Sequence, residues 1–259
     1  MRLVIRQRSL YLFLIICFAA SLNVSLFALT KDEVKEEIKL GRSIAAVIAG
    51  LYGVADNEKL VTYLNLVGQT VVLSNGRSDI SYSFEILESN TLNAFGCPGG
   101  YIFVTSGLLD VLENEAELAG VLAHEIAHVN YRHVFRTLFP NRKKSVDALL
   151  SGILGAKNVS FSVAFNQFVN KGLEILLKKG LQHQDELEAD VAATFYLTNS
   201  GYDNQAYKAL LIKLRTTTES YSNTHPPMQD RLANVADFLD DNIPQGKRLE
   251  KRFVSRAIR

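Results

Sequence analysis

The sequence has only two cysteines and no tryptophan among its 259 residues. Cys17 lies in an apolar N-terminal run and Cys97 in the body of the chain, so we expect no intramolecular disulfide in the mature protein. An excess of charge is also missing, because 28 basic residues stand against 27 acidic ones. This balance argues against a nucleic acid as a partner. Since 47% of the residues are apolar, we expect a globular domain with its own core.

The first 28 residues have the order of a secretory signal. Three arginines precede an apolar run over residues 10–29, and no acidic residue occurs before Asp32. The run is also nearly long enough to cross a bilayer as a helix. We therefore predict that residues 1–28 are a signal peptide or an uncleaved N-terminal membrane anchor. The body is then extracytoplasmic, in the periplasm or tethered to a membrane through its N-terminus.

Cys17 raises a further alternative, a lipid attached to its sulfur. Bacterial lipidation sites usually have a small residue just before the cysteine, whereas Ile16 is large. A cysteine buried within the apolar run is the simpler interpretation, and the cleaved, lipidated and anchored forms all stay open.

Apolar spacing predicts a mostly helical domain over residues 29–245 and a basic, flexible tail over 246–259. The period changes to two over residues 80–86, which is typical of a strand with one buried face. Two more short strands flank the turn at 96–100. The predicted fold class is therefore α+β, with a small, mostly antiparallel sheet. Helices are predicted over 32–52, 58–73, 107–112, 115–138, 181–199, 204–216 and 226–240, with others inside 145–180.

The strand that follows the Gly-Gly turn is a candidate substrate-binding strand. It comprises Gly100, Tyr101, Ile102 and Phe103. If its edge is exposed, an extended peptide can pair with it through backbone hydrogen bonds. A strand paired only within its own sheet is equally consistent with the sequence.

The motif His124-Glu125-Ile126-Ala127-His128 carries the chemistry of this sequence. In a helix, residues four apart lie about 40° apart around the axis and one turn along it. Both imidazoles therefore project side by side and can chelate one Zn²⁺ ion. Glu125 lies about 100° from His124 around the helix and can reach a water molecule beside the metal. The alternative is a helix with ordinary surface or core histidines, which the apolar residues 118–123 make less attractive.

A catalytic zinc ion needs a third protein ligand and one open position. One later predicted helix offers Glu186, Glu188 and Asp190. Glu186 and Asp190 are four apart and share a helix face, whereas Glu188 points elsewhere and is interpreted as a solvated charge. The residues alone do not choose between the two glutamates.

Three separated motifs resemble the HtpX/BepA-type zinc metallopeptidases, a gluzincin family related to the CAAX prenyl proteases. The first motif comprises Asn93-Ala94-Phe95, Pro98-Gly99-Gly100, Gly107-Leu108-Leu109, the run from Glu115 to Leu122, and the His-Glu-x-x-His sequence. The second motif is Glu186-x-x-x-Asp190, and the third is Thr224-His225-Pro226 with Arg231 six residues later. The resemblance covers roughly residues 40–240.

This resemblance implies a zincin-type domain in which two helices cross at one zinc ion per chain. It implies Glu186 as the third ligand and Asp190 as a partner that orients a zinc-bound histidine. His225 is implied to approach the zinc ion and gate it, with Arg231 beside the site. Both are also candidates for stabilising an oxyanion. Polypeptides are the implied substrates, in particular unfolded or misassembled envelope proteins.

His133 invites a competing interpretation as the third zinc ligand. Metzincins place that histidine ten positions after the first, with a glycine between. His133 is nine positions after His124, and Tyr131 occupies the place of the glycine. We therefore interpret His133 as a residue behind a ligand or at the surface.

The predicted function is that of a zinc-dependent metalloendopeptidase with Glu125 as the catalytic base. The alternative is a zinc-containing chaperone or assembly factor whose protease site is normally closed by His225. The presence of Glu125 favours chemistry, because a purely structural zinc site has no use for it.

Overall fold

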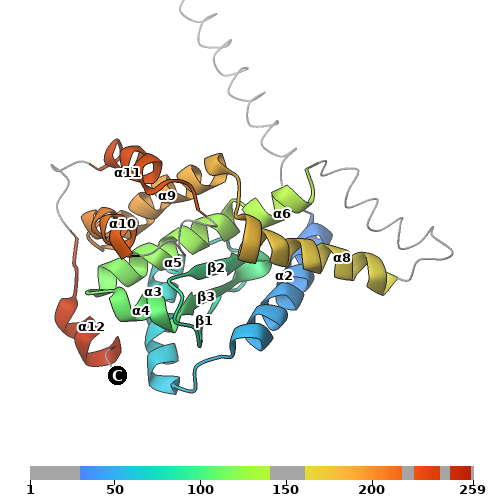
Figure 1. Ribbon diagram of the computed structural model, residues 1–259, viewed down its shortest axis with the longest axis horizontal. Helices are drawn as coiled ribbons and strands as arrows, with labels where there is room; N and C mark the ends of the chain where they lie inside the picture. The colour runs from blue at the N-terminus through green and yellow to red at the C-terminus, as the bar shows by residue number, and fades with distance from the viewer. Residues whose placement is uncertain (1–29, 141–160, 218–224, 240–245, 258–259) are drawn as a thin grey trace, which may run out of the picture. The chain divides into compact units, whose positions relative to one another are not determined.

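The computed structural model describes residues 30–140, 161–217, 225–239 and 246–257 (Figure 1). The chain divides into two compact units, Met1–Lys35 and Glu36–Arg259. The predictions for residues 1–28, including Cys17, lie outside the described residues. Among the described helices, none is long and apolar enough to cross a membrane.

The described elements follow the predicted order closely. The fold class, a mostly helical α+β domain, is confirmed. The long helix predicted over 115–138 is instead two helices, because Arg132 adopts a left-handed conformation that ends the first. The elements are α2 (Lys31–Tyr52), α3 (Glu58–Asn75), β1 (Ser83–Leu87), β2 (Ala94–Cys97), η2 (Pro98–Gly100), β3 (Tyr101–Thr105), α4 (Ser106–Val111), α5 (Glu115–Asn130), α6 (His133–Leu138), α8 (Phe161–Glu174), η3 (Ile175–Lys179), α9 (His183–Asn199), α10 (Gln205–Thr217), α11 (Met228–Ala236) and α12 (Glu250–Ala257).

The sheet is mixed, and the expectation of a mostly antiparallel sheet was wrong. Its strand order is β1-β3-β2. The tight turn at η2 makes β2 and β3 antiparallel neighbours, with Ala94 opposite Val104. On its other side β3 pairs in parallel with β1, with Ser83 opposite Tyr101. The last of the three strands in the sequence, β3, therefore occupies the centre of the sheet.

Alternating strand residues separate two hydrophobic clusters. One cluster lies between the sheet and helices α3, α4 and α5, and the other includes residues of α2, α6 and α8. Each large buried side chain stabilises the fold by about 1.5–3 kcal/mol. Strand residues of the first cluster are Phe84, Ile86, Ala94, Ile102 and Val104, and those of the second are Leu87, Phe95, Cys97 and Phe103.

Helix α5 lies at the centre of this arrangement (Figure 1). Every residue from Glu115 to Val129 is buried. Asn114 begins the helix, because its side chain accepts a hydrogen bond from the Glu117 N–H at 3.0 Å. Contacts to α9, α3, α10 and β2 surround it. Histidines on such a helix have little access to solvent, so their ring nitrogens need partners within the protein.

Residues 246–257 are not the flexible tail that their basic charge predicted. Helix α12 buries Phe253, which is 2% exposed and belongs to the first hydrophobic cluster. Arg252 donates hydrogen bonds to the buried carboxylate of Glu115. A buried apolar anchor and a buried acidic partner therefore order this segment.

Replacing Arg252 with methionine is expected to destabilise the protein most at neutral pH. Burial raises the pKa of Glu115, but hydrogen bonds from Arg252, Tyr202 and Tyr63 outweigh it, so the pKa is lowered overall. The ion pair therefore stabilises the fold above the unfolded pKa of about 4.3 and loses its effect as the pH falls below it. We expect a loss in the free energy of unfolding of about 1–2 kcal/mol at pH 7.

Urea titrations at pH 7 and pH 3.5 measure this effect. The loss should shrink at the lower pH, and an equal loss at both would contradict the ion pair as its cause. Arg256→Met is the matched control, because Arg256 lies on the same helix and is exposed.

Candidate active site

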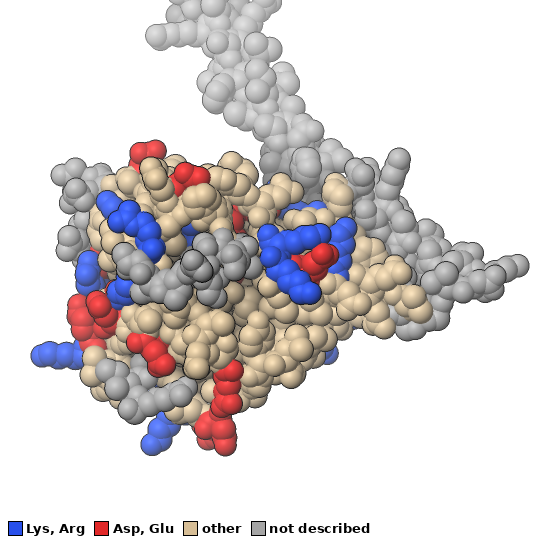
Figure 2. Space-filling view, in the orientation of Figure 1, with Lys and Arg blue, Asp and Glu red and all other residues tan. Residues whose placement is uncertain are grey.

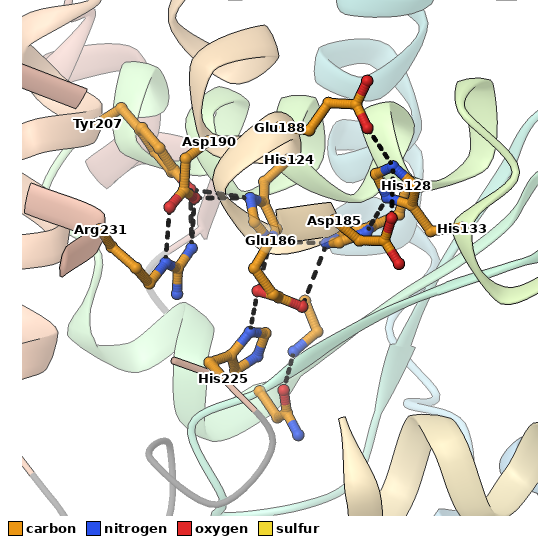
Figure 3. Close-up of polar contacts among 12 residues, drawn as sticks. His124, His128, His133, Asp185, Glu186, Glu188, Asp190, Tyr207, His225 and Arg231 are labelled. Atoms are coloured by element: carbon orange, nitrogen blue, oxygen red, sulfur yellow. Dashed lines mark hydrogen bonds and ion pairs between the residues drawn. The ribbon is translucent and has the colours of Figure 1, made fainter. Parts of the chain in front are cut away.

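Three candidate ligands from two helices converge on one point (Figure 3). The Nε2 atoms of His124 and His128 lie 2.9 Å apart. In the Glu186 carboxylate, Oε2 lies 3.6 Å from Nε2 of His124 and Oε1 lies 3.6 Å from Nε2 of His128. All three side chains are buried. Two imidazole nitrogens and a carboxylate at these distances can hold a metal ion, and this donor set suits zinc.

The two helices supply these ligands for simple geometric reasons. His124 and His128 are one turn apart on α5 and project from the same face. Glu186 lies in the first turn of α9, which packs against α5. The structure thus places the predicted His-Glu-x-x-His helix and the predicted Glu186 helix across one another at a single site.

Asp190 holds His124 on the side away from this point (Figure 3). Its Oδ1 atom lies 3.0 Å from His124 Nδ1. Arg231 donates to Asp190 through Nε at 2.9 Å and Nη2 at 2.6 Å, and both side chains are fully buried. Burial raises the pKa of Asp190, but Arg231 and His124 lower it well below its usual range. An anionic Asp190 accepts the Nδ1–H of His124, which leaves Nε2 available to a metal.

Tyr207 completes this buried network, and the sequence analysis missed it. Its hydroxyl donates to Asp190 Oδ1 at 2.6 Å and lies 3.0 Å from His124 Nδ1. Tyr207 lies on α10, where an apolar spacing predicts core residues. No local pattern distinguishes this tyrosine from a packing residue.

Without metal, the pKa values of the two α5 histidines, His124 and His128, are shifted in opposite directions. Burial lowers the pKa of His124, but Asp190 and Glu186 outweigh it and raise the pKa to about 9. Burial and the nearby His124 lower the pKa of His128 well below its ordinary value. Burial raises the pKa of Glu186, whereas His225, His128 and His124 lower it strongly, so it is a carboxylate. A metal that binds here must displace the proton of His124.

Glu125 lines a small cavity beside the three candidate ligands. The cavity has a volume of about 30 Å³ and is also lined by His128, Glu186 and His225. Burial raises the pKa of Glu125, and His124 and His225 only partly oppose it. A carboxyl group with a raised pKa holds an accepted proton more readily than an ordinary glutamate, which suits a group that must accept a proton and pass it on.

His225 lies over the site, whereas Arg231 does not line its cavity. His225 Nδ1 lies 2.7 Å from Glu186 Oε2, and its ring centroid lies 6.1 Å from that of His124. Arg231 is directed to Asp190 behind His124. Of the two candidates for stabilising an oxyanion, only His225 is therefore in reach of the cavity.

The predicted substrate-binding strand is wrong in its location. Tyr101, Ile102 and Phe103 belong to β3, which is paired on both sides, and Gly100 lies in the preceding turn. A strand with both edges paired cannot accept a peptide. The sequence alone showed three strands but not which one lies in the middle.

The outer edge of strand β2, the edge away from β3, borders the cavity. Residues 93–96 line the cavity together with Glu125. The Thr105 N–H donates to the Asn93 carbonyl at 3.0 Å, so the backbone groups of Ala94 and Gly96 point away from β3 in the antiparallel pattern. No other strand pairs with this edge within the ranges that the structure describes.

Comparisons with known proteins agree with this geometry. Peptidase family M48 matches residues 58–238. The "Beta-barrel assembly-enhancing protease" of Escherichia coli (strain K12) is 28% identical over 221 residues, which cover 81% of this chain and 45% of that protein. Its namesake in Yersinia pestis is 30% identical over 197 residues, 71% of this chain and 40% of that protein. The "Mitochondrial metalloendopeptidase OMA1" of Schizosaccharomyces pombe is 27% identical over 186 residues, 69% of this chain and 53% of that protein.

The chain belongs to peptidase family M48. This result confirms the resemblance that the three sequence motifs predicted. The family and the names of these relatives support a metalloprotease, which is a hydrolase. The chain spans about half the length of the curated relatives that it matches.

Proposed function

We propose that the protein is a zinc-dependent metalloendopeptidase that binds one zinc ion per chain. The convergence of His124, His128 and Glu186 carries this proposal. Nε2 of each histidine and the carboxylate of Glu186 would hold the ion, with Glu125 beside them as catalytic base. When bound, zinc lowers the pKa of a water molecule towards about 7 and polarises a carbonyl group.

The protein's own residues divide the remaining work. Glu125 accepts a proton from the attacking water and delivers it to the nitrogen of the leaving amine as the peptide bond breaks. Asp190, with Tyr207 and Arg231 behind it, keeps His124 in the orientation that a metal needs. Buried surroundings strengthen each of these interactions, because the local dielectric constant is low.

The outer edge of β2 is proposed to bind the substrate, in place of the β3 residues predicted first. An extended peptide can pair with the backbone groups of Ala94 and with the carbonyl of Gly96, whose N–H faces Glu125, and so pass beside Glu125. Backbone pairing depends little on side chains, which suits unfolded polypeptides of varied sequence. A neighbouring cavity of about 10 Å³, lined in part by Leu108, Val121 and Leu211, also borders Glu125.

Unfolded or misassembled envelope proteins are the proposed substrates, and the periplasm the proposed location. The name of the bacterial relatives, which refers to β-barrel assembly, supports this context. The signal-like or anchor-like residues 1–28 ahead of a metallopeptidase domain over 29–245 support export. Charges of both signs are interspersed on the face in Figure 2, and most of the described surface there is uncharged.

Two measurements test this proposal directly: the zinc content of the purified protein and its cleavage of an unfolded test protein such as casein. We expect one zinc ion per chain and cleavage that stops when a chelator removes the metal. Zinc binding without any cleavage would instead favour the chaperone or assembly factor. A preparation that binds no zinc after reconstitution would exclude the proposed centre.

Replacing His225 with alanine is expected to increase cleavage, by up to about tenfold. His225 lies against Glu186 at 2.7 Å and lines the cavity where a substrate carbonyl would sit. Its removal should open this position without removing a ligand. The measurement is kcat/KM for the test protein at equal zinc content. A decrease would show that His225 assists the reaction and does not gate the site.

Replacing Gly96 with alanine is expected to lower kcat/KM by about 100-fold without loss of zinc. An added Cβ would lie 2.7 Å from the backbone oxygen of Glu125 and 3.0 Å from its Oε2 atom, so β2 must move away from α5. Gly50→Ala is the matched control, because an added Cβ meets no atom within 4 Å there. Equal activity of the two variants would argue against the β2 edge as the substrate site.

A further inference from the structure

His133 lies against the outer side of His128 and is fully buried (Figure 3). The Nδ1 atoms of the two rings are 2.8 Å apart. On the far side of its ring, His133 Nε2 lies 3.2 Å from Glu188 Oε2 and 3.7 Å from Asp185 Oδ1. His133 therefore lies between a candidate zinc ligand and two carboxylates.

The backbone turn at Arg132 places His133 there. In a continuous helix, His133 would project about 140° away from His128 around the axis. Arg132 instead adopts φ 58° and ψ 37°, a left-handed conformation that costs roughly 1–2 kcal/mol. Its side chain forms a 2.8 Å ion pair with the buried Glu37 and lies 4.2 Å above the Phe135 ring. These contacts offset the cost and return His133 to His128.

The positions of the hydrogens on the His128 and His133 rings decide whether His133 can bind a metal or only accept a hydrogen bond from His128. If His128 binds zinc through Nε2, its Nδ1 carries hydrogen and donates to His133 Nδ1. A neutral His133 then carries its own hydrogen on Nε2, the atom that faces Glu188 and Asp185. That nitrogen has no lone pair left for a metal.

A second metal site is the competing interpretation of the same residues. His133, Asp185 and Glu188 bring one potential ligand atom each within 4.8 Å of the others. With zinc on His128, however, a metal on His133 Nε2 would require one of the two rings to lose a second proton. The hydrogen-bonded chain needs no such loss.

We propose that His133 is a positioning residue that fixes the tautomer and orientation of the zinc ligand His128. Glu188 and Asp185 fix His133 in turn, so Glu188 is not the purely solvated charge that its sequence position predicted. The inference rests on the zinc site proposed above. His124 and His128 thus have different partners, an anionic Asp190 behind the first and a neutral histidine behind the second.

Zinc affinity of the full chain, measured by competition with a chelator, tests this role. His133→Leu should weaken zinc binding about 10- to 100-fold. His133→Asn should retain most of the affinity, because its side-chain oxygen can accept the hydrogen bond from His128. His183→Leu, at an exposed histidine of α9, is the matched control and should bind zinc like the wild type. If the asparagine variant is as weak as the leucine variant, hydrogen bonding to His128 is not the cause.

The ¹⁵N NMR signals of His133 in the zinc-loaded protein provide a second, independent readout. We expect the neutral tautomer with hydrogen on Nε2. Hydrogen on Nδ1, or a second bound zinc ion that Glu188→Gln removes, would overturn the proposal. If the wild type binds one zinc ion and His133→Leu binds it equally well, this inference alone fails. If the wild type binds none, the proposed function fails with it.

Discussion

Replacing Glu125 with glutamine is expected to lower cleavage by about 100- to 10,000-fold while one zinc ion per chain is retained. Glutamine keeps the size of the side chain but cannot accept the proton of the attacking water. Zinc should stay bound, because the three proposed ligands are His124, His128 and Glu186. The measurement combines kcat/KM for an unfolded test protein with metal analysis of the same sample.

The control for this substitution is Glu113→Gln. Glu113 is an exposed glutamate just before α5, and its side chain pairs with Lys213 at the surface. It should cleave like the wild type. Cleavage at the wild-type rate by Glu125→Gln would show that another group accepts the proton, and loss of zinc from that variant would show that Glu125 supports the metal site itself.

Replacing Arg231 with leucine is expected to reduce the free energy of unfolding by about 3–5 kcal/mol. Arg231 and Asp190 are both fully buried, so the substitution removes two hydrogen bonds to the Asp190 carboxylate and leaves only His124 and Tyr207 as its partners in the interior. A loss of this size lowers the melting temperature by roughly 6–20 °C in a chain of this length. The experiment uses metal-free protein, so that a change in zinc binding does not enter the measurement.

Two further variants show whether the buried ion pair is responsible. Arg231→Leu combined with Asp190→Leu should recover part of the loss, because no buried carboxylate then remains without its guanidinium partner. Arg215→Leu is the matched control, since this arginine is exposed at the end of α10. An Arg231→Leu variant as stable as the wild type would contradict a structural role for the pair and limit Arg231 to the chemistry of the site.

Most of the fold could be predicted because its signals are local. The helical period in α3 and the alternation in β1 depend on residues a few positions apart, and the observed elements agree with those predictions. The break between α5 and α6 could not be predicted in this way. It depends on Arg132 in a left-handed conformation and on an ion pair with Glu37, which is distant in the sequence.

The structure of residues 246–257 could not be predicted from local signals either. The six basic residues of 246–259, read alone, predict a solvated and flexible segment. Burial of Phe253 and the ion pair with Glu115 order α12 instead. The few apolar residues of this charged segment do not show by themselves whether a distant surface will cover them.

The sequence by itself determined the chemistry of this protein: two histidines one helical turn apart with a glutamate between them, and the family to which those motifs belong. These features depend on spacing along one helix, and every helix of that sequence reproduces them. The tertiary structure alone decided that Glu186 meets both histidines, that β2 and not β3 borders the cavity, and that Tyr207 and His133 stand behind the candidate ligands. Those contacts join separate segments, and packing among the helices and the sheet sets them, not any local pattern.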